Sequence, residues 1–316
     1  LMPGNKIRKY DTWHAMGQGA TTGSLVVTLE ALKEMHLTPE DIQLIQNDTK
    51  TCPDTGMAGA SRSLYMDGNA TIIAANKLLA AMRKEDGTLR TYDEMKAEGI
   101  ETKYLGRYET NTTPGLCRLD PNTGIGDPTP AFTYCLNLAE VEVDTKTGKT
   151  TVLKFTCVDF VGRIGNIDAV NGQAYSGIMH GIGFALKEDY ADVKKHANMF
   201  GAGTSYIKDV PDDINLIHID GAISDGPFGS SGASEAFQAS GHCAVLNGIY
   251  NACGVRIHEI PALPEKVKAG LDAIAKGEKP YEPKKYFLGS DMYEELENIK
   301  ENPVQVGTQS FYVSLD

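Results

Sequence analysis

The chain has 316 residues and a formal net charge of −12 at pH 7, with 42 acidic and 30 basic side chains. This length can bury a large core without disulfides, in one big domain or in two smaller ones. Because lysine and arginine are interspersed with acidic residues, the sequence offers no basic stripe for a phosphate backbone, and we expect no nucleic-acid partner.

The cysteines and the chain start predict a soluble protein of the reducing cytoplasm. The six cysteines form no Cys-x-x-Cys pair, so we expect free, buried thiols and no iron–sulfur or zinc site. They are Cys52, Cys117, Cys135, Cys157, Cys243 and Cys253. The seven histidines also lack zinc-like spacing. The basic run Lys6 to Lys9 is not followed by the apolar stretch of a signal peptide, and no apolar window approaches the roughly 20 residues of a membrane span.

Apolar residues recur with helical spacing in some segments and alternate with strand spacing in others. In the first part of the chain, the spacing predicts helices at 21–35 and 66–82, with a strand at 42–45 between them, and a short helix at 92–97. A hairpin at 132–160, a helix at 167–186, a strand at 214–219 and a helix at 230–253 follow. An amphipathic helix at 267–274 precedes a Pro-rich, acidic tail. The polar, Gly-rich segment 84–130 predicts a surface excursion near a substrate entrance. This mixed order predicts an α+β or mixed α/β fold.

Three Gly-rich segments each end where a helix is expected to begin. Residues 17–20 present backbone amides that suit a phosphate, although they match neither a Walker loop nor a Rossmann fingerprint. Residues 54–63 add hydroxyl groups and a guanidinium that can hold an anion. In residues 226–235, Glu235 lies among small and apolar residues, where burial and a helix terminus can tune a carboxylate as a base. For each segment alone, an ordinary capped helix is the simpler explanation.

In this order, the segments resemble the molybdenum hydroxylases, the aldehyde oxidoreductase and xanthine dehydrogenase family. Met16-Gly17-Gln18-Gly19 is similar to the glycine–glutamine loop of the family, and Ala60-Ser61-Arg62-Ser63 to its serine-rich segment. The helix around Gln173 resembles its glutamine-bearing helix, and Gly232-Ala233-Ser234-Glu235 the segment with its glutamate. The likeness covers most of the chain, and the sequence of residues 229–237 is similar to that of bacterial aldehyde oxidoreductases. Ala15 departs from the pattern, because the family often has an acid there.

This resemblance implies a molybdopterin cofactor, in its cytosine dinucleotide form, with Glu235 as the catalytic base. The implied cofactor contacts are Gly17, Gln18, Gly19, Ala20, Ala60, Ser61, Arg62, Ser63 and Gln173. No protein ligand to molybdenum is implied, because a pterin dithiolene holds the metal. The implied reaction oxidises aldehydes to carboxylic acids, with water-derived oxygen and hydride abstraction at molybdenum.

The resemblance also implies a place for the chain in a larger enzyme. Residues 1–260 would form the C-terminal half of a molybdenum-cofactor-binding domain, with subdomains at about 1–130 and 131–260, and residues 261–316 a helix and an extended tail. The implied partners are the N-terminal half of that domain and iron–sulfur domains with 2Fe–2S clusters, in some members with FAD, in a homodimer. Two alternatives stay open: a hydroxylase of N-heterocycles such as xanthine or nicotinate, and a cofactor-free structural or interaction domain.

Overall fold

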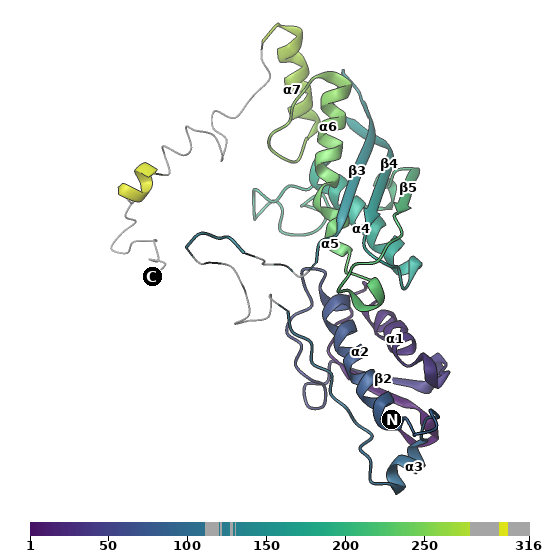
Figure 1. Cartoon of the computed structure of the whole chain (residues 1–316). Helices are drawn as coiled ribbons and strands as arrows, with labels where there is room; N and C mark the ends of the chain where they lie inside the picture. Colours follow the sequence, from purple (N-terminus) through teal and green to yellow (C-terminus); the bar gives the residue numbers. More distant parts are fainter. Residues whose placement is uncertain (111–119, 121, 127–128, 130, 279–296, 303–316) are drawn as a thin grey trace.

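The computed structural model describes residues 1–110, 120, 122–126, 129, 131–278 and 297–302. Its helices are α1 (Ala20–Ala31), α2 (Ser63–Met82), α3 (Tyr92–Ala97), α4 (Ile167–Leu186), α5 (Ser234–Ala239), α6 (Gly241–Cys253) and α7 (Pro264–Ala275). Its strands are β1 (Ile7–Asp11), β2 (Ile42–Gln46), β3 (Tyr134–Val143), β4 (Thr150–Phe160) and β5 (Asp213–His218). Figure 1 shows two groups of elements: β1, β2 and α1 to α3 form the first group, and β3 to β5 with α4 to α7 form the second. The mixed α/β fold is therefore as predicted.

The first group is a two-stranded parallel sheet with helices packed on it. β1 pairs with β2, with Ile7 opposite Ile42, and α1 packs against α2. Leu78, Met82 and Met95 lie with Ile7 in one buried cluster. β1 was not predicted, because its sequence Ile-Arg-Lys-Tyr-Asp carries one aliphatic side chain and three charged ones.

A buried polar network explains how such a charged strand is accommodated. The Lys9 ammonium lies 3.0 Å from the Asp11 carboxylate and 2.9 Å from that of Asp67, and it donates to Ser24 Oγ at 2.8 Å. Asp11 is 2 % exposed and also accepts from the Gln46 amide at 2.7 Å. Burial raises the pKa of Asp67 above its usual range. One cation therefore holds two acids together and joins β1, β2, α1 and α2.

The second group is a three-stranded sheet with helices on one face. β3 and β4 form an antiparallel hairpin, and β5 lies parallel to β4. Phe155 of β4 and Phe237 of α5 are fully buried between the sheet and the helices. The glycines of α4 permit close packing, because a Cβ on Gly177 would lie 2.6 Å from Phe237 Cβ and one on Gly181 would lie 2.8 Å from Gly241 Cα. The small residues of α4 therefore let it pack directly against the backbone of α5 and α6.

The helix predicted over 230–253 is wrong in its extent. Residues 230–233 are not helical, α5 ends at Ala239, and α6 begins at Gly241. Ser240 between them has a φ of −125° and a ψ of 2°, which is not helical. The break lies where Gly241 meets Gly181 of α4, so the chain changes direction to let α6 pass close to α4. The other predicted helices and strands are confirmed to within a few residues.

The thiols are free in the described residues, but their expected burial is wrong for most of them. Only Cys157 is buried among the described cysteines, and Cys243 is exposed. The partly exposed cysteines are Cys52, Cys135 and Cys253. Cys117 lies outside the described residues. Helix α6 is amphipathic, and Cys243 lies on its outer face.

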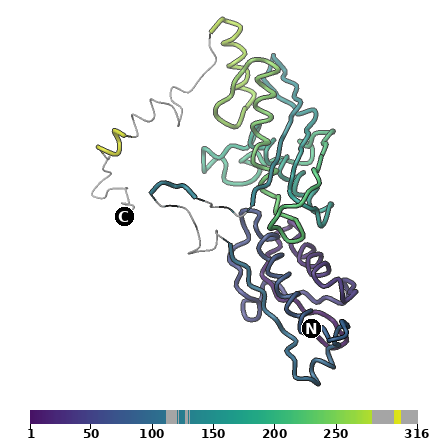
Figure 2. The backbone as a smooth tube through the Cα atoms, in the orientation of Figure 1, coloured from purple at the N-terminus to yellow at the C-terminus, as the bar shows by residue number. Residues whose placement is uncertain are grey.

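The chain segment that comes after α3 packs along α2 in its first part, so this part is not a free loop. Figure 2 traces this backbone as it returns from α3 along the first group. Lys77 Nζ donates to Leu105 O at 2.8 Å, and a Cβ on Gly106 would overlap Ala70 O. Most of residues 111–130 and of the acidic tail beyond 278 lies outside the described residues. No helix among the described residues is long and apolar enough to cross a membrane.

Candidate functional site

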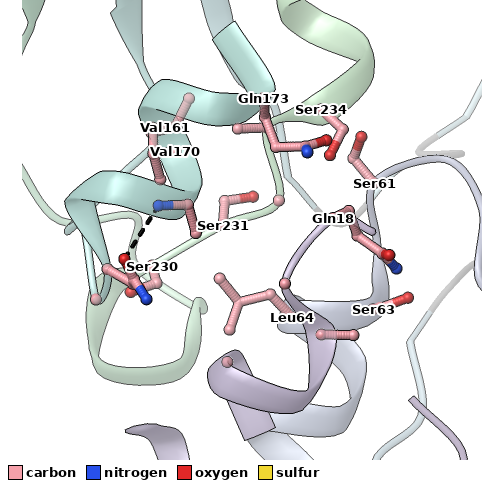
Figure 3. A pocket seen from close by; sticks show the side chains of 18 of the residues that line it. Gln18, Ser61, Ser63, Leu64, Val161, Val170, Gln173, Ser230, Ser231 and Ser234 are labelled. Carbon is pink, nitrogen blue, oxygen red and sulfur yellow. Dashed lines mark hydrogen bonds between the residues drawn. The ribbon is translucent and has the colours of Figure 1, made fainter. Parts of the chain in front are cut away.

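A cavity of about 640 Å³ lies between the two groups of elements. The starts of α1 and α2 line it from the first group, and the first turns of α4 and the loop before α5 line it from the second. Figure 3 shows Gln18, Ser61 and Ser63 on one side of the cavity and Gln173 and Ser230 across from them. A volume of this size suits an organic ligand or cofactor.

The glycine loop before α1 is braced by its own glutamine. Gln18 Oε1 accepts from the Met16 N–H at 2.5 Å, and Gln18 Nε2 donates to His14 O at 2.6 Å. Gly19, the residue before the first turn of α1, has a left-handed φ of 85°, which favours glycine. The Gln18 side chain therefore shapes the loop, and the start of α1 faces the cavity.

Among the polar side chains that line the cavity without a partner in the described residues are those of Gln173 and Arg163. The Gln173 amide lies on α4, and the Arg163 guanidinium lies in the loop between β4 and α4. Asn166 fixes the start of this helix, because its Oδ1 accepts from the Ala169 N–H at 3.0 Å. Both side chains are thus held by ordered backbone and remain available to a ligand.

The loop before α5 is joined to the end of β4. Ser230 Oγ donates to Arg163 O at 2.6 Å, and the Ser231 N–H donates to Val161 O at 3.0 Å. The side-chain hydroxyls of Ser231 and Ser234 line the cavity and have no partner in the described part of the chain. This loop therefore offers hydroxyl donors from a rigid backbone.

Glu235 lies in the first turn of α5, and hydrogen bonds tie its carboxylate to the loop before α2. The Ala60 N–H donates to Oε1 at 3.1 Å, and the Ser61 hydroxyl donates to Oε2. The Glu235 N–H donates in return to Ser61 Oγ at 3.0 Å. The Glu235 side chain is exposed, so the expected burial is wrong, and hydrogen bonds hold the carboxylate instead.

The structure brings most of the predicted site residues together. Those that line the cavity are Gln18, Gly19, Ala20, Ser61, Ser63, Gln173 and Glu235. Gly17, Ala60 and Arg62 lie just outside the lining. Ala60 instead contacts Glu235, and Arg62 Nη2 donates to Met57 O at 3.3 Å within its own loop.

Arg163, Ser231 and Ser234 were not predicted as site residues. Arg163 stands in Val-Gly-Arg-Ile-Gly-Asn, an arginine flanked by glycines after a strand, which is a weak signal without the fold. Ser231 and Ser234 belong to the segment that carries Glu235, but nothing in the spacing separates their hydroxyls from that of Ser230, which donates to Arg163 O in the loop between β4 and α4.

The residues present fit a phosphorylated organic cofactor better than a metal ion bound by the protein. No group of three or more His, Cys, Asp or Glu side chains among the described residues is placed to hold a metal. The cavity instead presents an unpartnered amide, a guanidinium and hydroxyl groups, which suit phosphate oxygens and the polar edge of a ring system.

The fold and the cavity together define a cofactor-binding domain. Residues 3–211 match the family model described as the molybdopterin cofactor-binding domain, and the chain belongs to this family, within the molybdenum hydroxylases.

Known members of the family are larger than this chain. The aldehyde oxidoreductase of Megalodesulfovibrio gigas is 42% identical over 267 residues, which are 84% of this chain and 29% of the relative. The crystal structure of the aldehyde oxidoreductase from Desulfovibrio desulfuricans ATCC 27774 is similar with a TM-score of 0.80 and 43% identity, over 85% of this chain and 29% of that one. The probable hypoxanthine oxidase of Escherichia coli (strain K12) is 28% identical over 83% of this chain and 29% of the relative. The chain thus spans about 29% of the length of each.

Proposed function

We propose that the cavity holds a molybdopterin cofactor and that the chain is the cofactor-binding part of an enzyme that oxidises aldehydes to carboxylic acids. One observation carries the proposal: segments far apart in the sequence bring Gln18, Ser61, Gln173 and Glu235 to one cavity. The 42% identity to an aldehyde oxidoreductase supports the choice of substrate class.

The unpartnered donors of the cavity are the residues that would hold the cofactor. The Arg163 guanidinium and the Ser231 hydroxyl suit phosphate oxygens, because charge-assisted hydrogen bonds are the strong ones. The Gln173 amide can donate and accept at the edge of a ring. When bound, the cofactor would supply the oxidation of the substrate carbon at its metal.

Glu235 would act as the base of this reaction. Its carboxylate accepts hydrogen bonds at Oε1 and Oε2, yet each oxygen keeps capacity to accept a proton released during oxidation. The exposed position of this side chain at the cavity makes it accessible to a substrate.

Further parts of the proposal concern the enzyme beyond this chain. We infer the cytosine dinucleotide form of the cofactor, 2Fe–2S clusters on other domains or subunits, an N-terminal half that completes the molybdenum domain, and a homodimer in the cytoplasm. The relatives are more than three times as long as the matched region, which supports the presence of further domains or subunits. The cofactor form, the clusters, the homodimer and the compartment rest on the resemblance to the family. Oxidation of an N-heterocycle is the second candidate, and the 28% identity to a probable hypoxanthine oxidase favours it less.

The test is an assay of the complete enzyme with a panel of aldehydes and with hypoxanthine and xanthine, alongside Glu235→Gln. We expect turnover of aldehydes, and we expect the variant to lose about 10²- to 10⁴-fold in kcat while its cofactor content stays unchanged. Turnover of the purines alone would favour the second candidate. Unchanged turnover of Glu235→Gln would reject Glu235 as the base.

A further inference from the structure

Glu235 and Ser61 form a reciprocal pair across the cavity mouth. The Ser61 hydroxyl donates to Glu235 Oε2 and accepts from the Glu235 N–H at 3.0 Å, while the Ala60 N–H holds Oε1 at 3.1 Å. Ser61 is therefore the residue that contacts both the backbone and the carboxylate of Glu235. This arrangement fixes the position of the helix start and the direction of its side chain together.

The backbone that supplies these donors is held in an unfavourable conformation. Ala60 has a φ of 55° and Ser61 a φ of 49°, both in the left-handed region that non-glycine residues rarely adopt. Without this turn, the Ala60 amide and the Ser61 hydroxyl would not point to the same carboxylate. Strained backbone of this kind persists where the surrounding contacts determine it, and here those contacts are with Glu235.

The two loops also touch at a second point that fixes their separation. A Cβ on Gly232 would lie 1.4 Å from Ser61 O, so glycine is the one residue type that allows this approach. The contact lies three residues before Glu235 and directly at Ser61. The distance between the serine and the carboxylate is thus set by backbone packing and not by flexible side chains alone.

We propose that Ser61 is a positioning residue for Glu235, in addition to lining the cavity. This inference rests on the proposed function, because it gives Glu235 the role of a base. The Ser61 hydroxyl donates to the carboxylate and holds it at one orientation toward the cavity. Loss of the hydroxyl should leave a carboxylate that points in several directions.

The first measurement needs no bound cofactor. In the 316-residue chain, Ser61→Ala, Glu235→Ala and the double variant form a cycle of unfolding equilibrium constants. We expect the two single effects to be non-additive by about threefold or more, because the side chains are in contact. Additive effects would overturn the inference. Ser61→Gly also removes the hydroxyl, and glycine adopts the left-handed φ of this position without strain. This variant therefore provides the same test if Ser61→Ala folds poorly.

The second measurement uses the complete enzyme. We expect Ser61→Ala and Ser61→Gly to lower kcat by on the order of tenfold to hundredfold while KM for the aldehyde stays nearly unchanged, because a misdirected base slows the reaction step and not substrate binding. Ser224→Ala is the matched control, because Ser224 is exposed and does not line the cavity. If Glu235→Gln is inactive but Ser61→Ala behaves like Ser224→Ala, the inference fails and the proposed function stands. If Glu235→Gln keeps full turnover, both fail.

Discussion

Gly232→Ala is the smallest change that should separate the two loops of the cavity. The added Cβ would lie 1.4 Å from Ser61 O and 2.5 Å from Ser61 C, whereas ordinary contacts begin near 3.4 Å. The loop before α2 must therefore retreat by about 2 Å, since both neighbours are backbone atoms that cannot rotate away. We expect a loss of about 1–3 kcal/mol in the free energy of unfolding and loss of the hydrogen bonds to Glu235.

Urea unfolding of the chain, compared with a matched glycine variant, gives the measurement. Gly172 lies on the exposed side of α4, and a Cβ there would meet nothing within 4 Å. Gly172→Ala should therefore raise the free energy of unfolding by roughly 0.5–1 kcal/mol, the gain of alanine over glycine in a helix. If Gly232→Ala is as stable as the wild type, the close contact between the loops does not exist in solution.

Three further predictions concern the first group and the isolated chain. Lys9→Met leaves two buried carboxylates without a cation and should cost about 3–5 kcal/mol in urea unfolding; a loss below about 1 kcal/mol would contradict the network. The Lys84 ammonium and the Thr91 N–H lower the pKa of Glu94 from 4.5 to about 2, so its contribution to stability is present above pH 4.5 and lost toward pH 2. Glu94→Gln should lower the urea midpoint at pH 7 but not at pH 2. The 316 residues expressed alone should show no aldehyde oxidation and should bind little molybdenum. Metal analysis that finds stoichiometric molybdenum would refute this prediction.

The elements that could be predicted from the sequence are those with apolar spacing. The hairpin of β3 and β4 and the helices α2 and α4 follow the expected periods closely. β1 could not be predicted, because its Lys9 ammonium is paired with Asp11 and also with Asp67, a residue 58 positions away from Lys9. The break between α5 and α6 depends on contact with α4, and contacts between helices leave no mark on local spacing.

The sequence indicates which segments contribute residues to the candidate site, but it does not indicate which contacts these residues make. Gln18 and Gln173 look equivalent in the sequence, but Gln18 braces its own loop while the Gln173 amide is unpartnered among the described residues. Arg163 reaches the cavity only because β4 ends beside the loop before α5. The bond between Ser61 and Glu235 joins residues 174 positions apart, which no spacing rule connects. The division of the chain near residue 130 and again near 260 stays a prediction.

The central claim is that the cavity between the two groups holds the molybdenum cofactor. X-ray diffraction from crystals of the complete enzyme, collected at the molybdenum absorption edge, would locate the metal directly. We expect one anomalous peak per subunit in the cavity that Gln18, Gln173 and Glu235 line. A molybdenum peak elsewhere in the subunit, with this cavity filled by solvent, would contradict the account.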